Sequence, residues 1–415
     1  WRPSTFAVFV GIRSTLMFRK TIFWIHLGCG VAAGLVILMM SFTGVLLTYE
    51  RQILAWAEQQ HYVPESDQST RLSLEQLHFI AQKERGDFNP NTIVVINDPG
   101  APVSFTAARR GGGGGFSLNP YTGEKMETGS PILENFFTIT TATHRRFNVT
   151  GENRELARGI TGASNLMFLF LLISGMYLWV PKIWKWGMFR IRFAFRGTAG
   201  NSKARYFNWH HVFGIWSAIP LVFVVTTASV FYYPWANNLV YQVYDEDLPS
   251  QIEGPAPATR NTTTQLNVGS MPSIPEFLSF DQLFANAASY IEQSSNESSG
   301  GWRQISLTLP GETSNTINFA IDQGNGGEPH KRHNLVLSRE TGEISIWQPF
   351  SSQSKGSQTR SIIRYLHTGE VLGILGQTIA GLVSLTSLFM VWTGLALAWR
   401  RLISPLYRKK SIPSA

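Results

Sequence analysis

Four histidines lie at the ends of four long apolar segments of this chain. His26 opens the first segment and His210 the third, whereas His144 precedes the second and His367 the fourth. An imidazole near an intramembrane helix end costs free energy, so it usually has a partner and a function. Two histidines on facing helices at one depth can bind a haem iron from both sides. The pattern predicts two such sites, His26 with His210 and His144 with His367.

The segments that must position these histidines are long enough to cross a membrane. We expect spans at 21–49, 159–180, 207–233 and 367–399. Each contains a run of about 20 or more uncharged residues, which matches a hydrocarbon core roughly 30 Å thick. Buried helices of soluble proteins are usually shorter, so the sequence predicts an α-helical membrane protein with four spans.

Basic residues are concentrated in three segments beside the spans. Segments 1–25, 181–209 and 400–415 hold sixteen of the 35 Lys and Arg and none of the 27 Asp and Glu. The positive-inside rule therefore places both termini and the 181–209 loop in the cytoplasm. The long polar regions, about 50–158 and 234–366, are expected in the periplasm. The net charge of +8 reflects this topology and is no evidence for nucleic-acid binding.

The single cysteine, Cys29, lies inside the first span and is expected to be a packing residue. One thiol excludes an internal disulfide, a cysteine-held iron–sulfur cluster and thioether-linked haem. Any haem is therefore expected to be non-covalent, as haem b is. The first apolar segment is too long for a cleaved signal peptide, so we expect it to remain as an anchor.

The two periplasmic regions repeat one another. Segments 72–77 and 278–283 both look like helix starts, with Ser as N-cap and an acid in the first turn. Each is followed by β-rich runs and by a Thr-Gly-Glu turn, at Thr122 and Thr341. We expect two small α+β domains, each a helix against a short antiparallel sheet. The five glycines 111–115 are expected to form a flexible hairpin connection.

The spans repeat as well. His26 and His210 each lie four residues before a glycine and eighteen before a small residue that follows a threonine. Both copies run in the same direction, which implies two tandem repeats related by a pseudo-two-fold axis along the membrane normal. Such an axis maps His26 onto His210 and His144 onto His367. The small-residue motifs that correspond are Thr43-Gly44 with Thr227-Ala228, and Ser174-Gly175 with Thr393-Gly394.

Ten segments follow from these patterns. They are a cytoplasmic N-terminus (1–20), transmembrane helix 1 (21–49), periplasmic domain 1 (50–131), a periplasmic surface helix and connection (132–158), transmembrane helix 2 (159–180), a basic cytoplasmic loop (181–206), transmembrane helix 3 (207–233), periplasmic domain 2 (234–366), transmembrane helix 4 (367–399) and a cytoplasmic C-terminus (400–415).

Some candidate site residues have alternatives. His211 is adjacent to His210 and faces another side of the helix, so it competes as a ligand, although the spacing to Gly214 favours His210. Arg145 and Arg364 neighbour the periplasmic histidines and could pair with haem propionates, since guanidinium binds carboxylates bidentately. Solvated surface charge explains both arginines equally well.

These motifs resemble a known family. The two Leu-Ser helix starts with their Thr-Gly-Glu turns resemble PepSY domains. The His-Xaa3-Gly span starts and Ser/Thr-Gly span ends resemble the PepSY-associated transmembrane family, over about residues 18–402. The resemblance implies an inner-membrane protein with two b-type haems, held by His26, His144, His210 and His367, that reduces ferric siderophores in the periplasm. The chain departs from the pattern at Thr227-Ala228 and in the 111–115 insertion.

The sequence therefore predicts an oxidoreductase that passes electrons across the inner membrane to a ferric siderophore or other ferric chelate, in iron uptake. The cytoplasmic segments are too short to fold a nicotinamide- or flavin-binding domain, so the donor is a separate reductase, free reduced flavin or a quinol. Two alternatives remain open. One is a non-enzymatic PepSY-type envelope scaffold, sensor or peptidase regulator, and the other is a metal or chelate transporter.

Overall fold

The computed structural model falls into two compact units. We call them the helical unit (Trp1–Glu50, Asn135–Leu239 and Ile363–Ala415) and the sheet unit (Arg51–Glu134 and Val240–Ile362). The glycine connection expected at 111–115 lies outside the described residues except for Gly115. The described residues are 5–64, 70–84, 90–107, 115–182, 184–197, 200–248, 277–294, 301–311 and 314–408, with the backbone alone described for 5–16.

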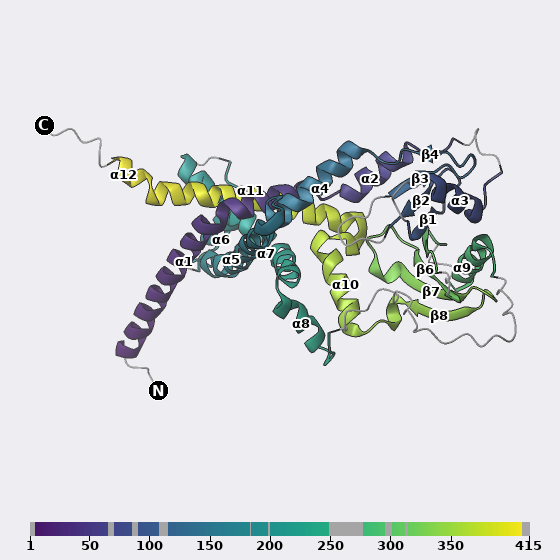
Figure 1. Ribbon diagram of the computed structural model, residues 1–415. Helices are drawn as coiled ribbons and strands as arrows, with labels where there is room; N and C mark the ends of the chain where they lie inside the picture. The colour runs from purple at the N-terminus through teal and green to yellow at the C-terminus, as the bar shows by residue number, and fades with distance from the viewer. Residues whose placement is uncertain are drawn as a thin grey trace. The chain divides into compact units, whose positions relative to one another are not determined.

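Long apolar helices build the helical unit (Figure 1). Among the described residues, four are long and apolar enough to cross a membrane, and each packs against two of the others, in the cyclic order α1, α5, α7, α11. The four bury a shared apolar core that includes Ile37, Phe168, Leu221 and Val383. The protein is thus a multi-pass membrane protein. The helices are α1 (Thr5–Leu46), α5 (Arg154–Trp179), α7 (Ser202–Tyr232) and α11 (Gly373–Leu402).

Buried polar side chains join neighbouring helices of the bundle. The hydroxyls of Ser41 on α1 and Ser387 on α11 are 2.9 Å apart. Asn165 on α5 donates to the carbonyl oxygen of Val225 on α7 at 3.0 Å and to the hydroxyl of Ser229 at 3.1 Å. Helices in a membrane associate through close packing and such hydrogen bonds, because lipid supplies no hydrophobic force between them.

A shorter helix precedes each of α5 and α11. Helix α4 (Pro131–Arg146) carries His144 in its last turn, and α10 (Lys355–Thr368) carries His367. The chain then turns sharply, through Phe147 and Asn148 (φ 57° and 58°) in one case and through Gly369 (φ 78°) in the other. His367 therefore belongs to a separate helix before the fourth span, in agreement with its place before the fourth apolar segment, whereas the predicted bounds 367–399 include it in that span. The left-handed Gly369 is what breaks the helix.

All eight strands of the described residues form one antiparallel sheet in the sheet unit, in the order β4-β3-β2-β1-β5-β6-β7-β8. The sequence predicts two separate small sheets, but β1 and β5 pair directly, with Ile93 opposite Leu307. Pairing removes two edges that would otherwise expose backbone donors and acceptors. The strands are β1 (Thr92–Ile96), β2 (Val103–Thr106), β3 (Gly115–Leu118), β4 (Lys125–Met126), β5 (Gln304–Thr308), β6 (Thr316–Asp322), β7 (Arg332–Ser338) and β8 (Ile344–Pro349).

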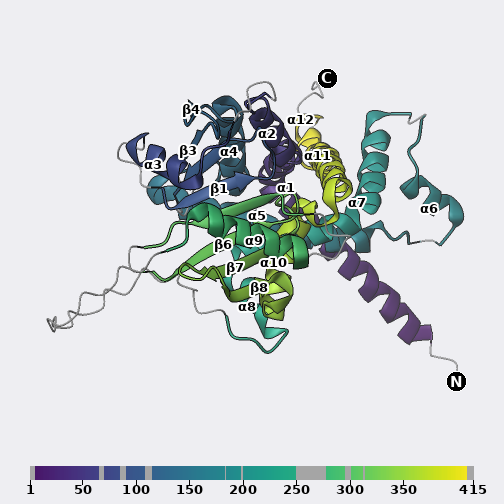
Figure 2. The same cartoon turned by 90° about the vertical axis from the view of Figure 1, so that its right-hand side faces the viewer.

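Helices α3 (Leu74–Glu84) and α9 (Phe280–Ser294) cover one face of this sheet (Figure 2). Each begins with the predicted serine N-cap: the Ser73 hydroxyl accepts from the Gln76 N–H at 3.1 Å, and the Ser279 hydroxyl from the Gln282 N–H at 3.2 Å. The remaining helices are α2 (Glu50–Gln59), α6 (Trp186–Phe193), α8 (Pro234–Gln242) and α12 (Ser404–Arg408), with the short 3₁₀ turns Gly151–Asn153, Pro329–Lys331, Phe350–Ser352 and Glu370–Leu372.

The two sheet helices also cap each other. The Asp281 carboxylate of α9 accepts from the Leu74 N–H of α3 at 3.0 and 3.2 Å. Glu75 of α3 accepts in return from the Phe280 N–H of α9. A first-turn acid usually serves its own helix, so this exchange ties the two sequence repeats together through their helix N-termini.

Candidate functional site

His26 on α1 is held by the second of the four long helices. Its Nδ1 lies 2.8 Å from the hydroxyl oxygen of Ser174 on α5. Ser174 donates its own proton to the Phe170 carbonyl oxygen at 2.6 Å, so it accepts the bond from the imidazole. The next residue, Gly175, leaves room for the ring: a Cβ there would lie 3.3 Å from Cε1 of His26.

His210 on α7 has the same arrangement with α11. Its Nδ1 lies 2.9 Å from the carbonyl oxygen of Met390 and 3.3 Å from the hydroxyl oxygen of Thr393. A Cβ at Gly394 would lie 3.1 Å from Cε1 of His210. At both histidines, a Ser/Thr-Gly dipeptide of the neighbouring helix therefore supplies a hydroxyl group to Nδ1 and a glycine that leaves room for the ring.

The other two histidines are held by α1 and α7. The Nδ1 of His144 lies 2.8 Å from the hydroxyl oxygen of Thr43, and a Cβ at Gly44 would lie 3.7 Å from Cε1 of the ring. The Nδ1 of His367 lies 2.9 Å from the carbonyl oxygen of Val224 and 3.2 Å from the hydroxyl oxygen of Thr227. The residue after Thr227 is Ala228, whereas a glycine follows the corresponding Ser or Thr at the other three histidines.

The threonines place the two histidine pairs far apart along the bundle. Thr43 follows His26 by seventeen residues on α1, and Thr227 follows His210 by the same number on α7. At 1.5 Å per residue this is roughly 25 Å, close to the thickness of a hydrocarbon core. One pair therefore lies towards each end of the bundle.

All four imidazoles can present Nε2 to a ligand. A carbonyl oxygen accepts only, and Ser174 and Thr43 already donate to carbonyl oxygens, so each Nδ1 carries the proton. In the neutral ring this leaves the lone pair on Nε2. A metal-bound histidine usually has its other nitrogen bonded in this way, which fixes the ring and makes it a stronger donor.

The members of each pair are near one another. His26 on α1 and His210 on α7 line one cavity. His144 and His367 interact electrostatically. Burial chiefly, and then the charge of His367, lower the pKa of His144 to about 4, so its imidazole is neutral at pH 7.

The cavity that contains His26 and His210 has a volume of about 1060 Å³. This is slightly more than the volume of most small-molecule pockets in proteins. Its walls include apolar side chains such as Phe168 and Leu172, and no Asp or Glu is among the described residues that line it. Its basic side chains are Arg19, Lys20, Lys182, Arg192, Lys203, Arg400 and Arg401.

His211 also lines this cavity but is held differently. Its Nδ1 lies 2.8 Å from the Phe207 carbonyl oxygen, one turn earlier on its own helix, and its ring packs against Phe207 with centroids 4.1 Å apart. The arrangement that matches His26 belongs to His210.

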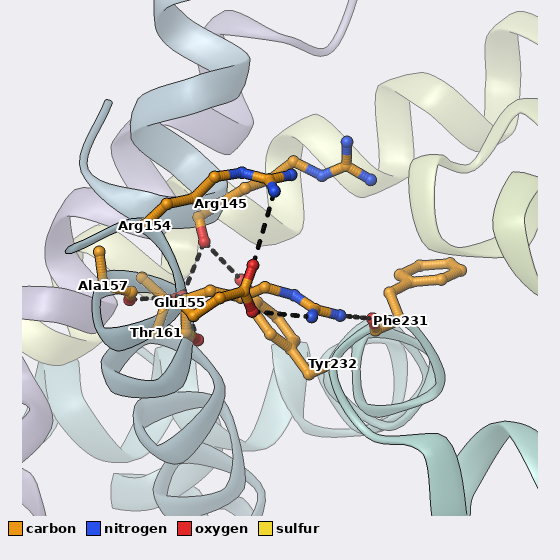
Figure 3. A network of polar contacts seen from close by, with 8 residues as sticks. Arg145, Arg154, Glu155, Ala157, Thr161, Phe231 and Tyr232 are labelled. Carbon is orange, nitrogen blue, oxygen red and sulfur yellow. Dashed lines mark hydrogen bonds and ion pairs between the residues drawn. The ribbon is translucent and has the colours of Figure 1, made fainter. Parts of the chain in front are cut away.

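The backbone of Arg145 fastens the end of α4 to two spans (Figure 3). Its carbonyl oxygen accepts from the Thr161 hydroxyl at 2.7 Å and from the Tyr232 hydroxyl at 3.5 Å. Arg158 donates to the Phe231 carbonyl oxygen at 2.8 Å and joins the same network. This network fixes the residue next to His144. The guanidinium of Arg364 lies 5.5 Å from the ring of Tyr365, and both Arg145 and Arg364 are exposed.

The sequence motifs contain the serine and threonines that bond to the histidines, but the motifs alone do not show that these hydroxyl groups have this role. Ser174, Thr393, Thr43 and Thr227 stand in the repeated motifs, where their small neighbours suggest only close helix packing. Each lies about 100 residues or more from the histidine it holds, so only the folded chain brings them together.

Among the described residues, no group of three or more His, Cys, Asp or Glu could hold a bare metal ion. A search of curated proteins finds no match to this chain. A family model, described as the PepSY-associated TM region, matches residues 23–401, nearly the whole chain. The four apolar helices and this match agree, and the chain belongs to the PepSY-associated transmembrane family.

Proposed function

We propose that this protein carries two haems b and passes electrons across the bacterial inner membrane to an acceptor in the periplasm. The first candidate for that acceptor is a ferric siderophore or another ferric chelate. The observation that carries the proposal is the arrangement of four histidines in two pairs, in which the Nδ1 of each ring is hydrogen-bonded by a neighbouring helix.

The residues at the His26–His210 pair fit a haem. A planar macrocycle needs space between helices, and the cavity of about 1060 Å³ with Gly175 and Gly394 behind the imidazoles supplies it. The two propionates of haem b need cations, and arginines and lysines line the same cavity. Bound haem supplies an iron that can take up and give back one electron.

The chain's own residues set the conditions at each pair. The Ser174 and Thr43 hydroxyls hold His26 and His144 in a single ring orientation. The apolar cluster around Ile37 and Phe168 keeps water and ions out of the region between the pairs. Burial in such surroundings, together with two imidazole ligands, tunes the reduction potential of an iron.

The matching contacts support an origin of the chain from two tandem repeats. Each repeat contributes one span that contains a histidine, His26 or His210, and one that has a Ser/Thr-Gly dipeptide near its end. The basic segments beside Arg19 and Arg400 support a cytoplasmic location for the His26–His210 end. The His144–His367 end then faces the periplasm, where the acceptor is met.

The chemistry of the acceptor explains the use of reduction. One electron converts Fe(III) in the chelate to Fe(II). Fe(II) is less charged and binds hard oxygen ligands less tightly, so the chelate releases it.

Haem content of the purified protein tests the proposal. Protein from haem-replete cells should show a b-type spectrum that changes with dithionite, and two haems per chain. His26→Ala or His210→Ala should remove one haem and leave the other, as should His144→Ala or His367→Ala. His330→Ala is the matched control, since His330 is exposed in the sheet unit, and it should retain both haems.

A colourless protein would refute the proposal and leave the envelope scaffold or the transporter. Four single variants that all keep two haems would refute the assignment of the ligands.

A further inference from the structure

The cavity with His26 and His210 carries more positive charge than one haem can neutralise. Seven basic side chains line it, and its described lining residues include no acid. Haem b has two carboxylates, so five positive charges would remain at the same opening. Bringing like charges together costs free energy unless an anion is bound there.

Three of the arginines have structural partners. Arg19 donates to the carbonyl oxygens of Leu178 and Val180 at 2.6 and 2.7 Å, at the C-terminal end of α5. Arg192 donates to the Trp179 carbonyl oxygen at the same helix end. Arg400 donates to the Ser202 hydroxyl at 2.8 Å. The contacts of Arg19 and Arg192 explain why arginine stands at those two positions, because cations favour a helix C-terminus and a guanidinium can donate twice.

The lysines at the opening are not explained in this way. Lys20, Lys182 and Lys203 are exposed and line the cavity from three different segments of the chain. Lysine binds phosphate as a mobile point charge, and several lysines around one opening can converge on a single phosphate group. Their convergence favours an anionic ligand.

Aromatic side chains stand beside these lysines. Trp24 lines the cavity and is 44% exposed, and Phe23 lies next to it. The Arg401 guanidinium lies 4.6 Å from the Phe23 ring centre and 5.1 Å from that of Trp24, so these rings form part of the basic opening. Rings of this kind stack on planar heteroaromatic molecules.

We propose that this opening binds a planar aromatic molecule with a phosphate group, of the class of flavin mononucleotide, as the electron donor. The inference rests on the proposed function and selects among its donors, since a quinol is uncharged and gains nothing from the lysines. Reduced flavin mononucleotide, FMNH₂, loses two electrons and two protons to give FMN. One donor molecule therefore reduces two ferric ions of the acceptor to Fe(II).

Binding of oxidised flavins to the full-length protein in detergent tests the inference. Flavin fluorescence should be quenched on binding, and FMN should bind at least about tenfold more tightly than riboflavin, which lacks the phosphate. Raising the salt concentration should weaken FMN binding and change riboflavin binding little.

Charge removal locates the site. Lys20→Gln and Lys203→Gln should each weaken FMN binding by about two- to fivefold. Lys185→Gln is the matched control, because Lys185 is an exposed cation of the same basic loop that does not line the cavity, and it should change binding less than about twofold.

The haem spectrum of each sample separates the two proposals. A haem-containing protein that fails to bind FMN, or binds riboflavin equally well, would overturn the flavin inference alone. Equal losses in the Lys20, Lys203 and Lys185 variants would also overturn it. A protein that binds FMN but contains no haem would refute the proposed function and leave the phosphate site standing.

Discussion

The hydroxyl of Ser174 should contribute more to ligand binding at its histidine than the hydroxyl of Thr393 does at the equivalent one. Ser174 is 4% exposed and lies 2.8 Å from His26 Nδ1. Among the described residues, no carbonyl oxygen shares that nitrogen. At His210 the Met390 carbonyl oxygen, at 2.9 Å, remains when Thr393 loses its hydroxyl.

The magnitudes follow from this difference. Ser174→Ala leaves a buried N–H without a partner, which costs about 1–3 kcal/mol. At about 1.4 kcal/mol per factor of ten, haem should leave the His26–His210 pair roughly 5- to 150-fold faster. Thr393→Val keeps the size of the side chain and the carbonyl bond, so haem loss should rise less than about threefold.

Transfer of haem to a soluble haem-binding protein measures these rates. Both variants are made in a His144→Ala, His367→Ala background, so that only the His26–His210 haem is followed. The reasoning is refuted if Ser174→Ala loses haem at the wild-type rate, or if Thr393→Val loses haem faster than Ser174→Ala does.

Three further predictions concern other parts of the chain. Gly394→Leu should displace His210, whose Cε1 would lie 3.1 Å from even a Cβ, and the absorbance spectrum should show one haem instead of two. Burial, then the neighbouring Asp281, raise the pKa of Glu75. Protonated Glu75 therefore contributes to the stability of the fold at any pH below the pKa that it has in the unfolded chain. This contribution is lost as the pH rises through the higher pKa that Glu75 has in the folded protein. Glu75→Gln should reduce the fall in melting temperature between pH 4 and pH 7. An equal fall in the variant and in the wild-type protein would contradict this. Leu307→Ala, at a fully buried position of β5, should lower the free energy of unfolding by about 2–5 kcal/mol. Ile346→Ala, which is 47% exposed on the edge strand, is the control and should lower it by less than about 1 kcal/mol in the same denaturant titration.

The sequence predicts the spans well because length and apolarity alone decide them. Four long apolar helices are present among the described residues, although α1, α5 and α7 begin before their predicted starts and α11 begins after its own. The serine N-caps at Ser73 and Ser279 were also predictable, because capping depends on residues within one turn.

The single sheet was not predictable in the same way. Repeated motifs suggest repeated domains, and nothing local in β1 or β5 specifies a partner from the other repeat. Their pairing is decided by the shared core, in which Ile93 and Leu307 are both fully buried. Long-range strand pairing of this kind is a property of the folded chain.

The two repeats differ in the spacing between the periplasmic histidine and the span that follows it. When Gly175 and Gly394 are aligned, His144 and His367 are four residues out of step. The structure places the difference in the connection after each histidine, where one chain turns through Phe147 and Asn148 and the other through Gly369. Both imidazoles nevertheless bond to equivalent threonines.

The distribution of partners across the chain fixes an order of events during synthesis. His26 and Ser174 can meet once the second span has been inserted, but the seat of His210 lies at Met390 and Thr393, near the end of the last span. His367 is also made late. The partners of His210 are therefore complete only after α11 has been made, whereas His144, His367 and the threonines that hold them all precede α11 in the chain.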